Sequence, residues 1–171
     1  MKRIFILFLF LLGCSVPSGR EYRIDLASRQ IDGINFMGTL SEIKGQLGNN
    51  TIQILPRDAI SDQGDRVIDT LWIISISDHH IIRQSNQTTV LIDDSVFKTN
   101  EGVGIGSSIQ EFVDHYGIPR FQEEDIGYTL IFNAYGLKLD VYIYPDCNCE
   151  HDFASLDKRC PVANFFITVP A

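Results

Sequence analysis

The chain has 171 residues, 44% of them hydrophobic and 11% aromatic, which is the composition of a folded domain and excludes an intrinsically disordered chain. It carries 14 Lys and Arg residues against 22 Asp and Glu residues, a formal net charge of −8. An acidic surface repels nucleic acid and anionic lipid head groups, so we expect no nucleic-acid partner and no basic membrane-binding patch.

The N-terminus has the pattern of a secretory signal. Lys2 and Arg3 form a positive start, and the apolar run Ile4–Leu12 follows directly. This run is too short to cross a bilayer as a permanent helix, and no second long apolar run follows it. We expect residues 1–13 to be a signal peptide, whose removal takes two basic residues away and makes the mature chain more acidic.

The tetrad Leu11-Leu12-Gly13-Cys14 at the end of that run resembles the lipobox of bacterial lipoproteins. The resemblance implies that Cys14 is acylated, with palmitate among its lipids, and becomes the first residue of the mature chain. A serine at position 15, rather than an aspartate, implies the outer membrane, with the domain facing the periplasm. Residues 14–21 then form a lipidated tether. The alternative is an ordinary signal peptide followed by an incidental cysteine.

The first half of the mature chain is predicted to hold strands on both sides of one short helix. Thr39 and Glu42 have the spacing of a capping box, and the apolar stripe behind them ends at Gly48, which supplies a left-handed stop. Strands are expected at Tyr22–Leu26, more weakly at Ile31–Phe36, and then at Thr51–Leu55, Val67–Ser77, Ile81–Ile82 and Val90–Ile92, with a loop at Pro56–Asp65.

The second half repeats this arrangement. Ser108 and Glu111 form a second capping box ahead of a second apolar stripe. Thr39 and Ser108 are 69 positions apart, and the same shift places Trp72 on Val141. Further strands are expected at Leu137–Tyr144 and Phe165–Val169.

These patterns predict an α+β fold in which two short helices pack on one face of an antiparallel sheet. Residues 22–171 form a single domain made of two similar lobes, at about 22–97 and 98–171, each with one helix and about three antiparallel strands. Consecutive strands without intervening helices exclude a doubly wound parallel sheet. Chance similarity between two ordinary helices is the alternative to a tandem duplication.

Cys147, Cys149, His151 and Cys160 form the cluster with metal-coordinating chemistry. Thiolates and imidazole suit zinc, so a Cys3His site is one hypothesis, although C-x-C departs from the usual C-x2-C spacing. An exported chain meets an oxidising compartment, which favours a disulfide between Cys160 and either Cys147 or Cys149. Because Cys14 carries lipid, one odd thiol then remains. A nucleophilic Cys149–His151 pair is formally available and carries no family signature.

Other polar or glycine-rich groups are interpreted as structural. The G-x-G-x-G run at residues 102–106 lacks the lysine of a P-loop and the spacing of a dinucleotide fingerprint, so we expect it to let the chain turn into the second helix. His79 and His80 would point to opposite faces of a strand and are expected to be solvated. The acidic run Glu123–Asp125 is expected in a solvated loop.

Two stretches, Ile31–Asn35 and Ile92–Ser108, together with Tyr116-Gly117, are similar to stretches of uncharacterised outer-membrane lipoproteins regulated by the envelope-stress factor sigma-E. The similarity consists of loop and helix-cap residues. It implies a location and a fold and no particular reaction. The cysteine-rich tail from Cys147 departs from that family.

No catalytic signature such as G-x-S-x-G or H-E-x-x-H occurs in the sequence. We therefore predict a non-enzymatic envelope lipoprotein, without cofactor or metal, that binds another protein or the cell wall. One alternative is an inhibitor of a periplasmic or incoming hydrolase, with Gln53–Arg66 as its protruding loop. Another is an enzyme or metal-binding protein that uses the cysteine cluster.

Overall fold

The computed structural model describes residues 20–60, 66–84, 89–145, 147 and 152–170. The expected signal peptide and Cys14 lie outside these ranges, as do Cys149 and His151. In chain order the described elements are β1 (Tyr22–Asp25), β2 (Gln30–Ile31), β3 (Ile34–Asn35), α1 (Leu40–Gln46), β4 (Thr51–Ile60), β5 (Arg66–Ile76), β6 (His79–Gln84), β7 (Thr89–Ile92), β8 (Phe97–Thr99), α2 (Ile109–Tyr116), β9 (Arg120–Glu124), β10 (Gly127–Ala134), β11 (Leu137–Ile143) and β12 (Asn164–Thr168).

The described strands form two sheets. An eight-stranded sheet has the order β4-β5-β6-β7-β12-β11-β10-β9, and all its neighbours are antiparallel. The strands β4 to β7 form one meander and β9 to β12 a second, and the two meet where β7 pairs with β12. A small sheet has the order β3-β2-β1-β8, in which β1 and β8 are parallel, so it joins segments from both halves of the chain.

Both helices begin at a complete capping box, as the sequence predicts. Thr39 Oγ1 accepts a hydrogen bond from the Glu42 N–H at 3.3 Å, and Glu42 Oε2 accepts one from the Thr39 N–H at 2.6 Å. Ser108 and Glu111 make the same two bonds, at 3.3 and 2.7 Å. These pairs satisfy amides that a helix leaves free at its first turn. Glycines in the left-handed region follow the helices, namely Gly48 and Gly117.

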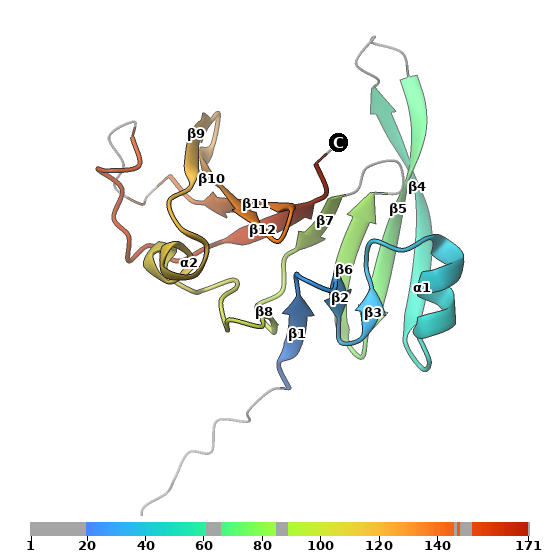
Figure 1. The fold of residues 1–171 in the computed structure, drawn as a ribbon. Helices are drawn as coiled ribbons and strands as arrows, with labels where there is room; N and C mark the ends of the chain where they lie inside the picture. Colours follow the sequence, from blue (N-terminus) through green and yellow to red (C-terminus); the bar gives the residue numbers. More distant parts are fainter. Residues whose placement is uncertain (1–19, 61–65, 85–88, 146, 148–151, 171) are drawn as a thin grey trace, which may run out of the picture.

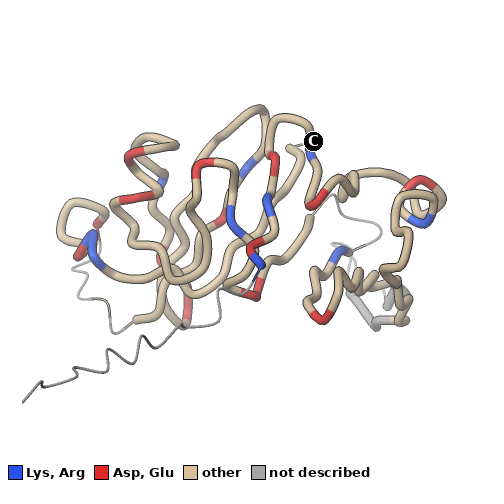
Figure 2. Tube along the Cα trace, turned by 90° about the horizontal axis from the view of Figure 1, so that it is seen from below, with Lys and Arg blue, Asp and Glu red and all other residues tan. Residues whose placement is uncertain are grey.

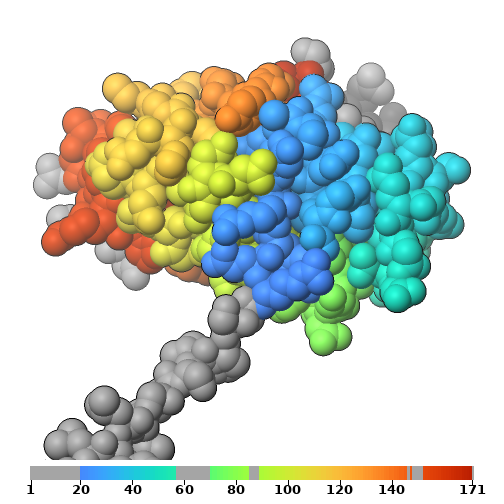
Figure 3. Space-filling view, turned by 60° about the horizontal axis from the view of Figure 1, so that its bottom comes forward, coloured from blue at the N-terminus to red at the C-terminus, as the bar shows by residue number. Residues whose placement is uncertain are grey.

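One face of the eight-stranded sheet is covered by α1, the small sheet and α2 (Figure 1). These segments meet as one continuous layer in the space-filling view (Figure 3). The core lies between this layer and the sheet, where Ile43 of α1, Phe112 of α2 and Phe97 of β8 are fully buried. The sheet contributes every second residue of its strands to this core, including Ile74, Ile76, Ile81, Val90, Ile92, Phe132, Leu139, Val141, Phe165 and Ile167.

The predicted loop at Pro56–Asp65 is wrong in its first half. β4 continues through Pro56 to Ile60 and pairs with β5 as far as Arg66. A proline is tolerated there because β4 is an edge strand, where one side of the backbone has no ladder partner. Pairing between β5 and β6 stops at Leu71, so the outer part of the β4–β5 hairpin extends beyond β6 (Figure 1).

Glu123–Asp125 is exposed as expected, but the predicted loop is wrong for Glu123 and Glu124, which belong to β9. This strand is the other edge of the sheet, and it pairs with β10 from Arg120 to Glu124. Charged side chains on an edge strand discourage pairing with another chain. The charged residues of this segment hide the pattern that would identify a strand in the sequence. In the structure Phe121 of β9 stacks on Tyr128 of β10, with ring centroids 5.4 Å apart.

The mixed helix and strand content predicted for the chain is confirmed, with two helices packed beside antiparallel sheet in the described residues. In the described residues each helix is followed by four strands of the eight-stranded sheet rather than three, and β8 of the small sheet comes before α2. The 69-position shift holds for the two N-caps and fails for the strands. Trp72 lies in β5, the second strand from one edge, whereas Val141 lies in β11, the third strand from the other.

Candidate functional site

No described helix or strand covers the face of the eight-stranded sheet opposite α1 and α2 (Figure 1), and we call this face the open face. Partners in antiparallel strands point to the same side of a sheet. One row of paired residues therefore crosses the whole open face, in the order Gln53, Ile73, Ile82, Leu91, Phe166, Asp140, Ile131 and Arg120. Four consecutive members, from Ile73 to Phe166, are apolar and only partly buried.

This apolar row was not predicted from the sequence. Its signal is the run Leu71–Ile74, which is apolar at successive positions and is typical of a strand buried on both faces. In the structure Ile74 is fully buried in the core, whereas Ile73 lies on the open face and is partly exposed. An antiparallel sheet with one wet face normally alternates apolar and polar residues. This sheet instead presents apolar side chains on both of its faces.

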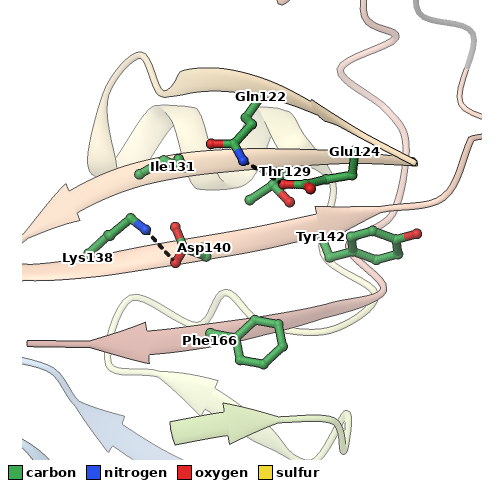
Figure 4. A pocket seen from close by; sticks show the side chains of 8 residues that line it. All are labelled: Gln122, Glu124, Thr129, Ile131, Lys138, Asp140, Tyr142 and Phe166. Carbon is green, nitrogen blue, oxygen red and sulfur yellow. Dashed lines mark hydrogen bonds and ion pairs between the residues drawn. The ribbon is translucent and has the colours of Figure 1, made fainter. Parts of the chain in front are cut away.

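A hollow of about 200 Å³ lies on the open face over the strands β9 to β12 (Figure 4). Lys138 Nζ lies 2.9 Å from Asp140 Oδ2, and Gln122 Nε2 donates a hydrogen bond to Glu124 Oε1 at 2.9 Å. The second carboxylate oxygen of Asp140, Oδ1, is buried and has no hydrogen-bond partner in the described part of the chain. The lining side chains are Gln122, Glu124, Thr129, Ile131, Lys138, Asp140, Tyr142 and Phe166.

Gly127 allows Tyr142 to form one wall of this hollow. A Cβ at Gly127 would lie 2.7 Å from Tyr142 Oη and 2.5 Å from the Ile143 carbonyl oxygen. The Tyr142 hydroxyl donates a hydrogen bond to the Ile126 carbonyl. Gly127 also has φ +101°, a backbone conformation that disfavours other residues. The position of the Tyr142 ring therefore depends on the glycine.

A second hollow, of about 560 Å³, lies over the other meander. Its carboxylates come from Asp93 and Asp94, directly after β7, and no Lys or Arg lines it. Its remaining lining residues are Ile73, His80, Ile82, Ser95 and Ile105. Leu91 and Phe166 stand between the two hollows in the apolar row, so the open face carries two concave acidic sites on either side of an apolar centre.

Asp94 lines the second hollow and is hydrogen-bonded to His79, whose ring packs against the small sheet on the other face. His79 Nδ1–H donates a hydrogen bond to Asp94 Oδ2 at 2.7 Å, and the Val96 N–H donates one to Oδ1 at 3.0 Å. Partial burial acts to raise the pKa of Asp94, but these two hydrogen bonds outweigh it and hold the pKa below its ordinary value. Asp94 is therefore an ionised acceptor at neutral pH.

The expectation that both histidines are solvated is wrong for His79. Its ring packs against Tyr22 and Phe97, with centroid distances of 5.6 and 6.4 Å. His80 is exposed on the opposite face, where its Nδ1 lies 3.0 Å from Ser75 Oγ. A Ser-His-Asp relay needs one imidazole between the hydroxyl and the carboxylate, and here two different imidazoles serve the two groups.

Arg83 is a buried cation that was not predicted from the sequence. It is 6% exposed on the core face of β6, and its guanidinium lies 4.7 Å from the centroid of the Trp72 ring. Its Nη1 donates hydrogen bonds to the carbonyl oxygens of Phe36, at 3.0 Å, and of Gly38. These bonds satisfy the carbonyls of the segment between β3 and α1. Arg83 thereby fixes the entry of α1 onto the sheet.

Cys147 and Cys160 form a disulfide, with their Cα atoms 5.9 Å apart, which is one of the two predicted pairings. Two sulfurs of the hypothetical Cys3His zinc site are thus occupied while the bridge is intact. The bridge holds the segment before β12 against α2. There the Ile109 N–H donates to the Cys160 carbonyl at 3.0 Å and the Gln110 N–H donates to the Lys158 carbonyl at 2.9 Å. In the described ranges, no three His, Cys, Asp or Glu side chains gather to hold a metal.

The glycine-rich run at residues 102–106 has the structural role expected of it. Gly102 and Gly106 have φ +87° and +82°. A Cβ at Gly104 would lie 2.5 Å from the Phe97 carbonyl oxygen, because Gly104 forms a β-bridge with Lys98. The run therefore folds the chain back against β8 before α2 begins.

No described helix is long and apolar enough to traverse a bilayer. No protein-family model and no curated protein matches the sequence. The fold is similar to that in the crystal structure of the uncharacterized protein yfeY from Escherichia coli, with a TM-score of 0.52 and 14% sequence identity. The similarity covers 86% of this chain and 99% of the Escherichia coli chain. At this identity it shows a shared fold alone.

Proposed function

We propose that the chain is a non-enzymatic, lipid-anchored lipoprotein of the bacterial outer membrane that binds another protein through the open face. The observation that carries the binding function is the partly exposed apolar row from Ile73 to Phe166. A contiguous apolar surface of this kind on a folded domain marks an interaction site, because covering it releases ordered water.

Support for the anchor comes from the sequence. The tetrad Leu11–Cys14 resembles a lipobox, and the loop and cap residues resemble lipoproteins regulated by sigma-E. A lipid anchor restricts the domain to the membrane surface, which raises its effective concentration near a partner in the same compartment. A modest affinity of the open face is then sufficient.

A protein fits the open face better than a cell-wall polymer does. The row contains the branched aliphatic side chains of Ile73, Ile82 and Leu91, which are stabilised by contact with other apolar side chains. A polar glycan supplies little surface of this kind. Cell-wall binding remains the alternative, and it predicts co-sedimentation with purified peptidoglycan that is lost when Phe166 is replaced by serine.

The two lobes are best explained by tandem duplication of one helix with four strands. Ser77 and Tyr135, in the β5–β6 and β10–β11 turns, have φ values of 55° and 54° and lie 58 positions apart. The same shift relates Ile73 to Ile131, each of which is the second residue from one end of the row of paired residues that crosses the open face. The longer β4–β5 hairpin accounts for the difference between this shift and the 69 positions that separate the helix caps.

Site-specific photocrosslinking in growing cells tests the binding function. p-Benzoylphenylalanine is placed at Phe166 or Ile73 on the open face, and at Lys44 on α1 as a control in the covering layer. We expect a discrete protein adduct from both open-face positions and none from Lys44. Absence of any adduct from the open face, or adducts from Lys44 alone, would contradict the proposal.

The β4–β5 hairpin, which projects beyond β6, supports a second candidate function, inhibition of a hydrolase. The predicted protruding loop at Gln53–Arg66 is in large part the strand β4, and its tip at residues 61–65 lies outside the described residues. The test replaces residues 58–68 by a two-residue Asn-Gly turn, which preserves the antiparallel pairing. If the shortened chain forms every adduct of the unmodified chain, the hairpin is not the binding element.

A further inference from the structure

Resting on the proposed binding function of the open face, we propose that its partner is a protein with a cationic contact surface, in which Lys or Arg side chains alternate with apolar ones. The cations enter the two hollows, and the apolar side chains cover the row between them. The open face thus selects its partner by charge as well as by shape.

One carboxylate oxygen of Asp140 is left unpaired in the first hollow. Lys138 occupies Oδ2 of this carboxylate, while Oδ1 is buried and has no partner within the described ranges. In Figure 4 the dashed line from Lys138 reaches one carboxylate oxygen and leaves the other oxygen of Asp140 without a contact. A carboxylate oxygen only accepts hydrogen bonds, so the group that is missing here is a donor.

Both hollows carry an excess of negative charge. The hollow over β9 to β12 contains Glu124, Asp140 and Lys138, which leaves one negative charge in excess. The hollow over the other meander contains Asp93 and Asp94 and no basic side chain except the imidazole of His80. Both are concave sites beside low-dielectric apolar side chains, where the potential of a fixed charge is focused.

The charge of the chain and the apolar row together exclude other occupants of the open face. Acidic positions are spread over the whole trace in Figure 2, and the chain as a whole has a net charge of −8. Anionic lipids, nucleic acids and acidic proteins are therefore repelled. A second copy of the chain docked face to face would bring the same carboxylates together. A free cation or a polyamine would leave the apolar row from Ile73 to Phe166 uncovered.

The test uses the full-length chain in isolated envelope vesicles, with p-benzoylphenylalanine at Phe166 as the crosslinker. Adduct yield is compared between the otherwise unchanged chain, an Asp93→Asn/Asp140→Asn variant and an Asp32→Asn/Asp114→Asn control. The control also removes two carboxylates, but from exposed positions between β2 and β3 and in α2, which belong to the layer on the opposite face. Circular dichroism melting of each purified chain checks that all three remain folded.

We expect the adduct yield to fall at least about tenfold in the open-face variant and to be unchanged in the control, because charge-assisted hydrogen bonds are lost only in the former. The yield of the unchanged chain should also fall as NaCl rises from about 50 to about 500 mM, because salt screens such contacts. An undiminished, salt-insensitive yield from the open-face variant overturns the cationic partner while leaving open-face binding intact. An adduct with a second copy of the chain, or with an acidic segment identified by mass spectrometry, also overturns it. Failure to crosslink from any open-face position contradicts the binding function itself.

Discussion

Leu91 of β7 and Phe166 of β12 are register partners at the junction of the two meanders, and both side chains stand on the open face. The next residue of β12 toward the N-terminus, Phe165, points the opposite way and is fully buried, with its ring centroid 6.0 Å from that of Phe112. Two adjacent phenylalanines thus serve the two faces of one strand.

The two phenylalanines should differ sharply in their effect on stability. Phe165→Ala leaves a cavity in the core and should cost about 3–5 kcal/mol in the free energy of unfolding. Phe166→Thr removes a partly exposed side chain and should cost less than about 2 kcal/mol, since threonine is well accepted in strands. Urea unfolding of both variants measures the difference. Equal costs would show that the open face is covered in the free protein.

Removal of the disulfide should destabilise the domain and loosen the start of α2. The bridge links two cysteines that are 13 positions apart, so Cys147→Ala/Cys160→Ala should lower the free energy of unfolding by about 3 kcal/mol. Hydrogen exchange of the Ile109 and Gln110 amides should accelerate, because their acceptors lie in the bridged segment. Reduction of the unmodified chain should reproduce both effects. Unchanged exchange at these amides would contradict the proposed connection.

Two glycines should respond oppositely to a methyl group. Gly104→Ala places a Cβ 2.5 Å from the Phe97 carbonyl oxygen, so the backbone must shift, at a cost of roughly 1–3 kcal/mol. Gly45 lies inside α1 with nothing within 4 Å of its Cβ position. Gly45→Ala should therefore stabilise the domain by about 0.5–1 kcal/mol. Thermal melts of the two variants, in the same buffer, should shift in opposite directions.

The pair of His79 and Asp94 should contribute to stability in a pH-dependent manner. The pKa of Asp94 is held below its ordinary value of 3.8 by hydrogen bonds from the Val96 N–H and His79, despite the opposing effect of burial. Stability from a lowered carboxyl pKa is present above the ordinary pKa and is lost as the pH falls through the lowered value. Asp94→Asn should therefore lower Tm at neutral pH, and the difference from the unmodified chain should shrink below about pH 4. A Tm difference that stays constant down to acid pH would be incompatible with this coupling.

The proposed lipid anchor makes a prediction that is independent of the domain. Cys14→Ser should leave the domain folded but block acylation and release the chain from the membrane fraction. Each buried methylene of an acyl chain contributes about 0.8 kcal/mol to membrane binding, which an acidic domain cannot replace. Membrane fractionation with metabolic palmitate labelling provides the measurement. An unlabelled wild-type chain, or a Cys14→Ser chain that stays in the pellet, would show that the lipobox resemblance misleads.

The sequence by itself determined the local structure. Both capping boxes, the two helices and the strands with clean alternation, such as β1 and β11, follow from hydrogen bonds and periodicities within a few residues. The strands at Pro56 and at Glu123–Glu124 were predicted as loops because proline and charged residues are unusual inside a sheet. An edge strand tolerates both, and only the strand order shows that β4 and β9 are edges.

The tertiary structure alone decided which face of the sheet is buried. An apolar run such as Leu71–Ile74 has the same sequence whether its second face is covered by a helix or is left open. Both helices and the small sheet pack on one side, and this places Ile73, Leu91 and Phe166 on the surface. The path of the chain between β11 and β12 likewise decided that Cys147, rather than Cys149, pairs with Cys160. A disulfide needs two Cα atoms within about 7 Å, and spacing along the chain does not determine that distance.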